Sequence, residues 1–274
     1  MDILMQAVIT KEVPGVPGTD VAGEAYEKCL QKIGRVARPD TKITISYPEK
    51  SSFILHSYYG AFLNNAAVIE GAIQAEKEGY DAVIICCYTD PGLQELREVL
   101  EIPVVGLAEP SMAIATMLGR SFAIIAPIKE FVPIYERNLR LYGFEDRAIR
   151  QQPIRPLDLP PTANRFERYL RFFEDPYSDL IPQFEGVAKS CVDDGAEVVI
   201  AGCGAIGPAL TMADYATVGE TGCPVIDPVS VAIKMAELLV DLRRAGGLSK
   251  SKVLAYRPLP EFMMQGIRKN FGLE

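Results

Sequence analysis

The chain has 274 residues, of which 49% are hydrophobic and 23% are charged, enough to bury a substantial core in one large domain or two of ordinary size. The formal net charge of -8 and the scattered basic residues argue against nucleic acid or an anionic membrane as the main partner, and favour a small molecule or a protein. The first ten residues lack the features of a signal peptide, and no apolar run reaches about 18 residues, so we expect a cytoplasmic protein.

Short apolar runs rich in β-branched residues alternate with longer stretches whose apolar residues recur at helical spacing. The runs predict strands buried on both faces, as in parallel sheets, at 3–9, 42–47, 81–86, 102–107, 121–126, 196–203 and 223–227. The stretches 62–79 and 229–242 predict amphipathic helices between such strands. The alternation indicates an α/β fold.

Residues 150–165 interrupt this pattern. They are rich in proline and have no apolar period, so we expect a connecting loop there. Such a loop either runs over the surface or lies over a functional site.

An internal repeat is the most informative feature. Residues 78–87 align with 194–203 without a gap, and each segment predicts the end of a helix, then a strand, then a cysteine at the last position. The alignment pairs Cys87 with Cys203, and Cys86 with a glycine. Buried cysteines are common in cores, but ligands bind beyond the carboxyl ends of parallel strands, where both cysteines fall. We therefore favour a functional pair over core packing.

A second pair of matching segments, 102–118 and 223–239, follows the first pair in each half of the chain. The repeat predicts two pseudo-symmetric α/β lobes with mainly parallel sheets and an active site in the cleft between them. We expect lobe one at 1–108 plus 227–274 and lobe two at 109–226.

One thiol from each lobe, facing the other across a cleft, suits a racemase or epimerase. Such an enzyme removes a proton from one face of a carbon and returns one to the opposite face, which takes an acid and a base of similar pKa. The ordinary pKa of a cysteine thiol is about 8.5, and nearby backbone dipoles lower it, so a cysteine serves as either the acid or the base. The backbone amides expected to favour the thiolate and the developing enolate are those of Tyr88, Thr89, Gly204 and Ala205.

Three further residues complete this picture. Asp90 is expected to cap the helix that follows Cys87, with Pro91 at the first position of that helix. No metal and no cofactor is required. Lys234, which a Schiff-base mechanism would need, is expected on a solvated helix face.

Four strings resemble the aspartate/glutamate/hydantoin racemase superfamily, and most closely its hydantoin and allantoin racemase branch: EGYDAVIICCYTDPGL, IPVVGLAEPSMAIATMLG, VVIAGCG and CPVIDPVSVAIKMAELL. The resemblance covers most of residues 55–145 and 186–242. It implies two Rossmann-like lobes, a reaction without cofactor, and a homo-oligomer. It also implies that Cys87 and Cys203 are the acid/base residues and that Cys86 points to the other side of its strand.

The chain departs from the family pattern where the family usually has polar substrate contacts. Residues 7–10, Ala-Val-Ile-Thr, stand in place of Asn-Pro-Asn after the first strand, and Ala126 and Pro127 stand in place of a threonine pair. Gly204 and Ala205 replace the Thr-Glu or Thr-His of the amino-acid racemases, which argues against aspartate or glutamate as the substrate. The expected substrate contacts are Thr10, Tyr88, Thr89, Gly204 and Ala205.

Several alternatives stay open at this point. Enzymes similar to maleate isomerase or arylmalonate decarboxylase use the same fold, and a two-lobed small-molecule-binding protein or a thiol-redox protein would differ in class. His56, Tyr58 and Tyr59 either lie near the substrate loop or form a helix-entry cluster. We expect the remaining cysteines, Cys29, Cys191 and Cys223, to be packing residues.

Overall fold

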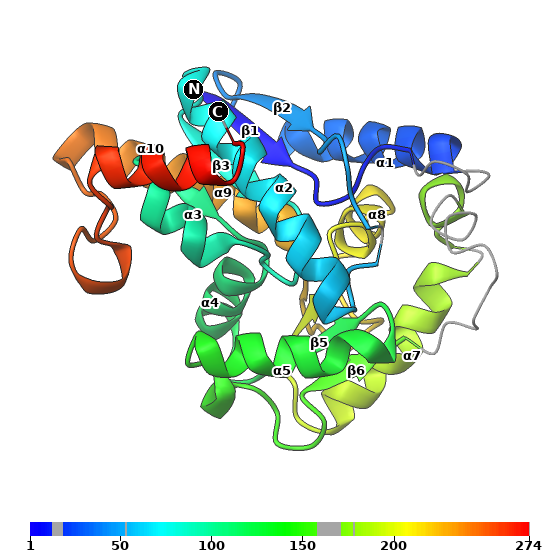
Figure 1. Ribbon diagram of the computed structural model, residues 1–274. Helices are drawn as coiled ribbons and strands as arrows, with labels where there is room; N and C mark the ends of the chain where they lie inside the picture. Colours follow the sequence, from blue (N-terminus) through cyan, green and yellow to red (C-terminus); the bar gives the residue numbers. More distant parts are fainter. Residues whose placement is uncertain (13–18, 53, 158–170, 178, 274) are drawn as a thin grey trace.

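Two four-stranded parallel sheets form the framework of the protein (Figure 1). The computed structural model describes residues 1–12, 19–52, 54–157, 171–177 and 179–273. The sheets have the same topology, with strand orders β2-β1-β3-β4 and β6-β5-β7-β8, and every pair of neighbouring strands is parallel. The strands are β1 (Asp2–Gln6), β2 (Lys42–Ser46), β3 (Ala82–Ile85), β4 (Val104–Val105), β5 (Phe122–Ala126), β6 (Ile154–Pro156), β7 (Val198–Ala201) and β8 (Val225–Ile226). The predicted α/β fold is therefore confirmed.

Helices follow the strands and cover both faces of the first sheet. The helices are α1 (Thr19–Ile33), α2 (Tyr58–Lys77), α3 (Leu93–Val99), α4 (Ala108–Leu118), α5 (Val132–Leu141), α7 (Leu180–Asp193), α8 (Ile206–Met212), α9 (Pro228–Gly246) and α10 (Glu261–Asn270). The predicted helical stretches fall on α2 and α9. Because side chains alternate along a strand, β3 packs against α2 and α3 through one face and against α9 through the other.

The two sheets share one apolar core. Its fully buried members include Ile84 of β3, Ile200 of β7, Met112 of α4 and Ile233 of α9. Two smaller apolar clusters cover the outer faces of the sheets, one cluster on each sheet. Since removal of apolar surface from water is the main source of stability, the common core holds the two halves together.

The first sheet takes its strands from residues 2–105 and the second from 122–226, which agrees with two pseudo-symmetric lobes. The expected lobe limits, 1–108 plus 227–274 and 109–226, stay a prediction.

Strand β6 corrects the expectation of a loop at 150–165. Its three residues pair with β5 at the edge of the second sheet. So short a strand shows no apolar period, and Pro156 fits there because an edge strand has one unpaired side. Residues 158–165 lie outside the described part of the chain, so the idea that they cover a site stays a prediction.

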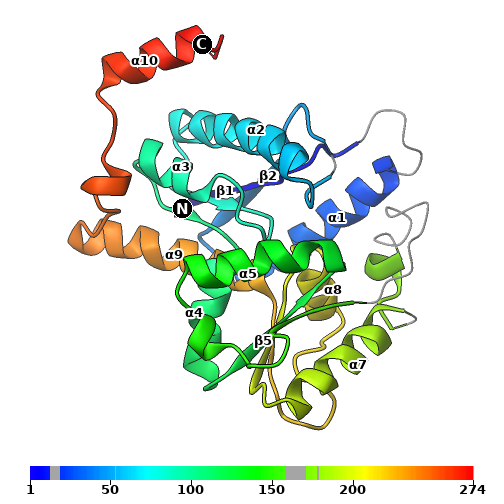
Figure 2. The ribbon, with the colours of Figure 1, turned by 60° about the horizontal axis from the view of Figure 1, so that its bottom comes forward.

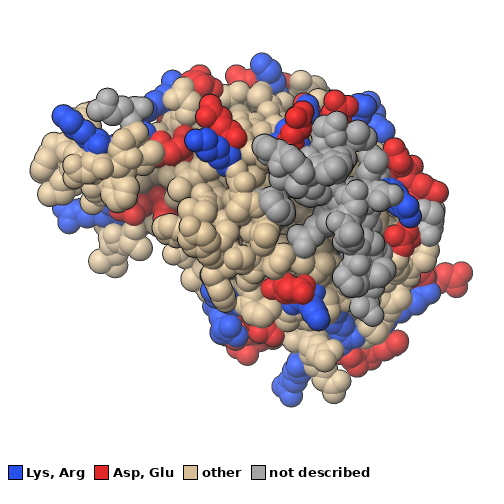
Figure 3. Space-filling model, turned by 45° about the vertical axis from the view of Figure 1, so that its right-hand side comes forward, with Lys and Arg blue, Asp and Glu red and all other residues tan. Residues whose placement is uncertain are grey.

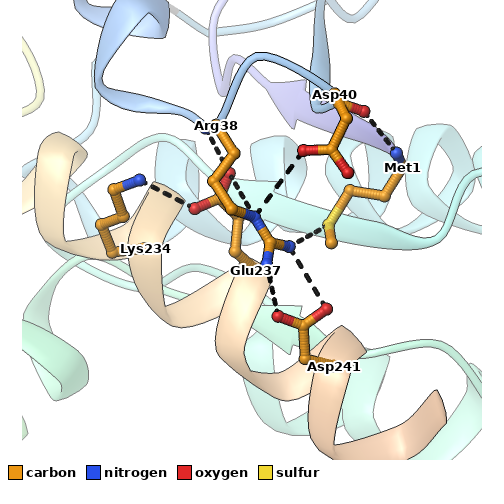
Figure 4. Close-up of polar contacts among 6 residues, drawn as sticks. All are labelled: Met1, Arg38, Asp40, Lys234, Glu237 and Asp241. Carbon is orange, nitrogen blue, oxygen red and sulfur yellow. Dashed lines mark hydrogen bonds and ion pairs between the residues drawn. The ribbon is translucent and has the colours of Figure 1, made fainter. Parts of the chain in front are cut away.

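Arg38 attaches α9 to the amino-terminal end of the first sheet (Figure 4). Its backbone amide donates to Glu237 Oε1 at 2.7 Å, and its guanidinium donates to both carboxylate oxygens of Asp241 at 2.6 and 3.2 Å. Lys234, on the exposed face of α9, lies 3.0 Å from the other oxygen of Glu237. Lys234 is therefore where the sequence predicted it, on a solvated helix face.

The carboxy-terminal helix α10 stands out from the body of the protein on the side of α2, away from the second sheet (Figure 2). Arg268 holds it there through a two-pronged ion pair with Glu70, at 2.8 Å for each oxygen. Its apolar side chains Phe262, Ile267 and Phe271 are exposed. The expected homo-oligomer stays a prediction.

Acidic and basic side chains are interspersed over the described surface on the face shown in Figure 3. Within the described ranges, no helix is both long enough and apolar enough to cross a membrane.

The Arg38 contacts predict a measurable loss of stability on removal of Glu237. Burial acts to raise the pKa of this carboxyl, but hydrogen bonds from the Arg38 amide and Lys234 outweigh it and lower the pKa. Glu237→Ala leaves the Arg38 amide without its acceptor, so urea titration should show the free energy of unfolding lowered by about 1–3 kcal/mol at pH 7.

Because the folded-state pKa of Glu237 is depressed, its contribution is present above the unfolded-state pKa and disappears as the pH falls. The gap between the wild type and the variant should therefore shrink below about pH 4. Glu130→Ala, at an exposed position, serves as the control. Equal urea unfolding midpoints for wild type and Glu237→Ala would contradict the stabilising role of Glu237.

Candidate active site

Cys87 lies in the turn that follows β3, an inner strand of the first sheet. Its side chain is buried, and its Sγ lies 3.1 Å from the hydroxyl oxygen of Thr89. The backbone amide of Thr89 also donates to the sulfur. The sulfur is therefore contacted by both the hydroxyl and the amide of one residue of its own turn.

Cys203 occupies the matching position after β7, an inner strand of the second sheet. It is partly exposed, whereas the other five cysteines of the chain are buried. The amide of Ala205 donates to Cys203 Sγ at 3.4 Å, and the amide of Ile206 also bonds to the sulfur. Thr89 and Ala205 stand two positions after their respective cysteines, so the predicted repeat extends to the donor that meets each sulfur.

The expected lowering of the thiol pKa values is wrong. Burial raises the pKa of Cys87 to about 11, and the amide and hydroxyl of Thr89 only partly offset it. Burial likewise raises the pKa of Cys203 against its two amide donors. The cost of moving an anion out of water is larger here than the stabilisation that the backbone dipoles give to the thiolate.

The two sulfur atoms are near enough to interact electrostatically. Besides burial, the charge of the Cys203 thiolate raises the pKa of Cys87. That the two thiols face each other across one substrate carbon stays a prediction.

Cys86 is buried in the core shared by the two sheets. Its Sγ lies 3.1 Å from the hydroxyl oxygen of Tyr26, on α1. Burial is the main cause that raises its pKa to about 12; the hydrogen bond with Tyr26 opposes this rise, and the charges of Cys87 and Cys203 contribute to it. Cys86 is thus packed in the interior, as expected, and it belongs to a different apolar cluster from Cys87.

Asp90 caps a different helix from the one predicted. Helix α3 has Gly92 at its N-cap and no side-chain cap. The carboxylate of Asp90 instead accepts the amides of Leu107 and Ala108, at 2.6 and 3.0 Å, and that of Glu109 at 3.2 Å, at the start of α4. The physical reason is a sharp turn at Asp90, with φ of 48°, that directs its side chain toward the neighbouring strand end. Burial raises its pKa to about 6.

The other predicted contact residues have defined positions. The ring of Tyr88 is buried, and its hydroxyl oxygen accepts a hydrogen bond from Ser111 at 3.2 Å. Gly204 packs so closely that a Cβ there would lie 3.3 Å from the Cys86 carbonyl oxygen. Thr10 follows β1, the neighbour of β3, and its amide donates to Ser51 Oγ at 2.8 Å.

The remaining predictions concern packing residues. Cys29, Cys191 and Cys223 are buried, as expected. His56 lies edge-on to Phe131, with ring centroids 5.9 Å apart. Tyr58 and Tyr59 are exposed and are the first two residues of α2, so they lie where this helix begins.

Sequence reasoning missed four residues around the two turns: Tyr26 of α1, and Tyr135, Asn138 and Tyr142 in and after α5. Asn138 Nδ2 donates to the Thr89 carbonyl oxygen at 3.1 Å, and the hydroxyl of Tyr142 donates to Asp90 at 2.8 Å. Tyr135 donates to the Gly202 carbonyl oxygen at 2.6 Å. For Tyr135, Asn138 and Tyr142 the only signal in the sequence is their helical spacing, which is also typical of core residues, and Tyr26 has no such signal.

Known proteins similar to this chain share its topology and much of its sequence. A family model described as Asp/Glu/hydantoin racemase matches residues 22–236. The hydantoin racemase of Pseudomonas sp. (strain NS671) is 34% identical over 240 residues, which cover 86% of this chain and 87% of that protein. The structure of allantoin racemase from Pseudomonas fluorescens has a TM-score of 0.76 and 27% identity, covering 95% of this chain and 97% of that one. Allantoin racemase from Klebsiella pneumoniae has a TM-score of 0.75 and 25% identity, covering 95% and 94%.

The site geometry predicts the order in which the thiols react. Cys203 should be alkylated by iodoacetamide before the other cysteines, because it alone is partly exposed. Its raised pKa should make the rate increase about tenfold per pH unit between pH 7 and 9, since only the thiolate reacts. Peptide mass spectrometry gives the rate at each cysteine, with Cys203→Ala as the control. Earlier modification of Cys29 or Cys191, or a rate that levels off below pH 8, would contradict the geometry.

Proposed function

The chain belongs to the Asp/Glu/hydantoin racemase family and is a racemase, and from that premise we propose a two-cysteine, cofactor-independent reaction on a small hydantoin-like substrate. The observation that carries the proposal is the matched placement of Cys87 and Cys203. Each follows an inner strand of its own sheet, and each receives the amide of the residue two positions later.

In the proposed reaction one proton leaves the stereocentre of the substrate and another is added to its opposite face. The thiolate of one cysteine takes the proton from the stereocentre beside a carbonyl group, and the electron pair of the C–H bond passes into an enolate. The thiol of the other cysteine then donates its proton to the opposite face of the same carbon. Atoms and charge balance, because one cysteine gains the proton that the substrate loses and the other loses the proton that the product gains.

Burial of the thiols suits this chemistry. A thiolate whose pKa is raised by burial is a stronger base than a free one, and a proton on carbon is weakly acidic. The same burial limits the fraction of thiolate at neutral pH. The amide donors from Thr89 and Ala205 offset part of that cost, and backbone amides at such turns also stabilise an enolate oxygen.

A neutral cyclic amide fits the surroundings better than a dicarboxylic amino acid does. Over the ranges that the structure describes, the hydrogen bonds of the turns at 87–92 and 203–207 involve hydroxyl, amide and carboxylate groups but no lysine or arginine. A substrate with two carboxylates needs cationic partners. The likeness to a hydantoin racemase over 86% of the chain supports the same substrate class.

The direct test is racemisation of a single enantiomer of a 5-substituted hydantoin in D2O, by protein dialysed against EDTA with no cofactor added. Optical rotation should fall to zero while one deuterium enters at the stereocentre and no carbon dioxide is released. Release of carbon dioxide would instead indicate a decarboxylase, and a requirement for added metal or cofactor would contradict the proposed mechanism.

Single serine variants test the two roles separately. Cys87→Ser and Cys203→Ser should each lower the racemisation rate by at least about a thousandfold, because a serine hydroxyl is far too weak an acid to replace a thiol. Each variant keeps one competent thiol, so each should still exchange the α-proton of one enantiomer with solvent deuterium. The spared enantiomer should be opposite in the two variants, as chiral chromatography with mass spectrometry would show.

Cys86→Ser is the matched control at the adjacent position. It should racemise at a rate close to that of the wild type and lose some stability, because its side chain is packed in the core. If Cys86→Ser were inactive and Cys87→Ser fully active, the acid/base residue would be Cys86, and the proposed role of Cys87 would be wrong.

A further inference from the structure

One face of α5 reaches the turns of both cysteines. Tyr135, Asn138 and Tyr142 are spaced by three and four residues, so they lie on the same side of the helix. Tyr135 Oη donates to the carbonyl oxygen of Gly202, directly before Cys203, at 2.6 Å. Asn138 Nδ2 donates to the carbonyl oxygen of Thr89, two residues after Cys87, at 3.1 Å. Helix α5, which follows β5 of the second sheet, is thus bonded to the Cys87 turn of the first sheet as well as to the Cys203 turn of its own sheet.

The third residue strengthens the connection to the first sheet. The hydroxyl of Tyr142 donates to Asp90 Oδ2 at 2.8 Å. Asp90 in turn accepts the amides at the start of α4, so α5 is linked to the Cys87 turn and to α4 through one carboxylate.

These contacts are formed out of water. Tyr135 is 2% exposed and Asn138 is 1% exposed. The ring of Tyr135 also meets that of Tyr88, next to Cys87, with centroids 4.9 Å apart and an interplanar angle of 61°. A buried carbonyl oxygen that loses its donor is costly, so the positions of both turns are firmly coupled to α5.

We propose that this face of α5, which we name the α5 brace (Tyr135, Asn138 and Tyr142), sets the separation of the two cysteine turns. Asn138 and Tyr142 are positioning residues for Cys87, and Tyr135 is a positioning residue for Cys203. The inference rests on the proposed two-cysteine function. It adds residues that touch neither thiol and belong to neither repeat.

The separation matters because two-base proton transfer requires the acid and the base on opposite sides of one carbon. The two turns belong to different sheets, and among the described strands none pairs across from one sheet to the other. Helix rise places Tyr135 and Tyr142 about 10 Å apart, a fixed length along a rigid element. A displacement of about 1 Å at a reacting group lowers the rate by as much as about a hundredfold.

Thiol reactivity tests the brace without any substrate. Asn138→Leu removes the donor to Thr89 while keeping the volume of the side chain, so the Cys87 turn should loosen and its alkylation by iodoacetamide should become about tenfold faster. The rate at Cys203 should change by less than about twofold. Tyr135→Phe should give the reverse pattern, with faster alkylation of Cys203. Tyr142→Phe, which removes a single oxygen atom, repeats the test on the Cys87 side if Asn138→Leu does not fold.

Proton exchange gives the second measurement. Racemisation has an equilibrium constant of one, so kcat/KM should fall equally in both directions, by about tenfold, in each brace variant. Exchange with solvent deuterium should nevertheless be uneven. Asn138→Leu should spare the enantiomer whose proton Cys203 removes, and Tyr135→Phe should spare the other enantiomer.

Leu139→Ala is the control for general destabilisation of α5. Leu139 is buried on the same helix and is not part of the brace. The Leu139→Ala variant should change the alkylation rates of Cys87 and Cys203 to the same extent, and likewise the exchange rates of the two enantiomers. Equal effects on the two thiols in Asn138→Leu and Tyr135→Phe, or no effect on either, would overturn the proposed brace. A wild type that fails to racemise hydantoins would instead overturn the proposed function, and the alkylation rates would still decide on the brace.

Discussion

Two buried carboxylates hold the helices against which the cysteine turns are built. Asp90 accepts the first amides of α4, and Asp227 accepts the amide of Val229 and the hydroxyl of Ser230 at the start of α9. Burial raises the pKa of both groups, to about 6 for Asp90, and the helix amides oppose that rise by stabilising the charged form. Helices α4 and α9 also pack against each other. The two capped helices therefore fix the strand ends of both sheets in one arrangement.

The two carboxylates reach equivalent places from different positions in the repeat. In the first half the carboxylate comes from the cysteine turn, and the strand end that faces it is Gly106. In the second half it comes from the strand end, and the cysteine turn that faces it contains Gly207. A Cβ at Gly106 would overlap the Asp90 carboxyl group, and one at Gly207 would lie 2.6 Å from Asp227 Oδ1. Each half thus has one carboxylate packed against one glycine. In the first half the cysteine turn supplies the carboxylate, and in the second half the cysteine turn supplies the glycine.

Local signals in the sequence were sufficient for every described strand except β6, for the repeat and for the amides of Thr89 and Ala205, because each depends on residues within a few positions of a strand end. Contacts between distant segments left no such signal. Asp90 bonds to a helix that begins at Ala108, and Asn138 reaches back to Thr89, so neither partner follows from spacing. The three residues of β6 were too few to show a period. The pKa values of the thiols depend on the total burial of the site, which only the packed structure determines.

The closeness of the two thiols also determines how many protons they hold. Because the charge of Cys203 raises the pKa of Cys87, loss of a proton from one cysteine makes loss from the other harder. A second anion in a site where burial already raises both pKa values is more costly than the first, so the second proton is lost at a higher pH than the first. A pair with one thiolate and one thiol is the state that the proposed two-base proton transfer requires in either direction. Burial, which works against forming the first thiolate, is thus also what keeps the second cysteine in its acid form.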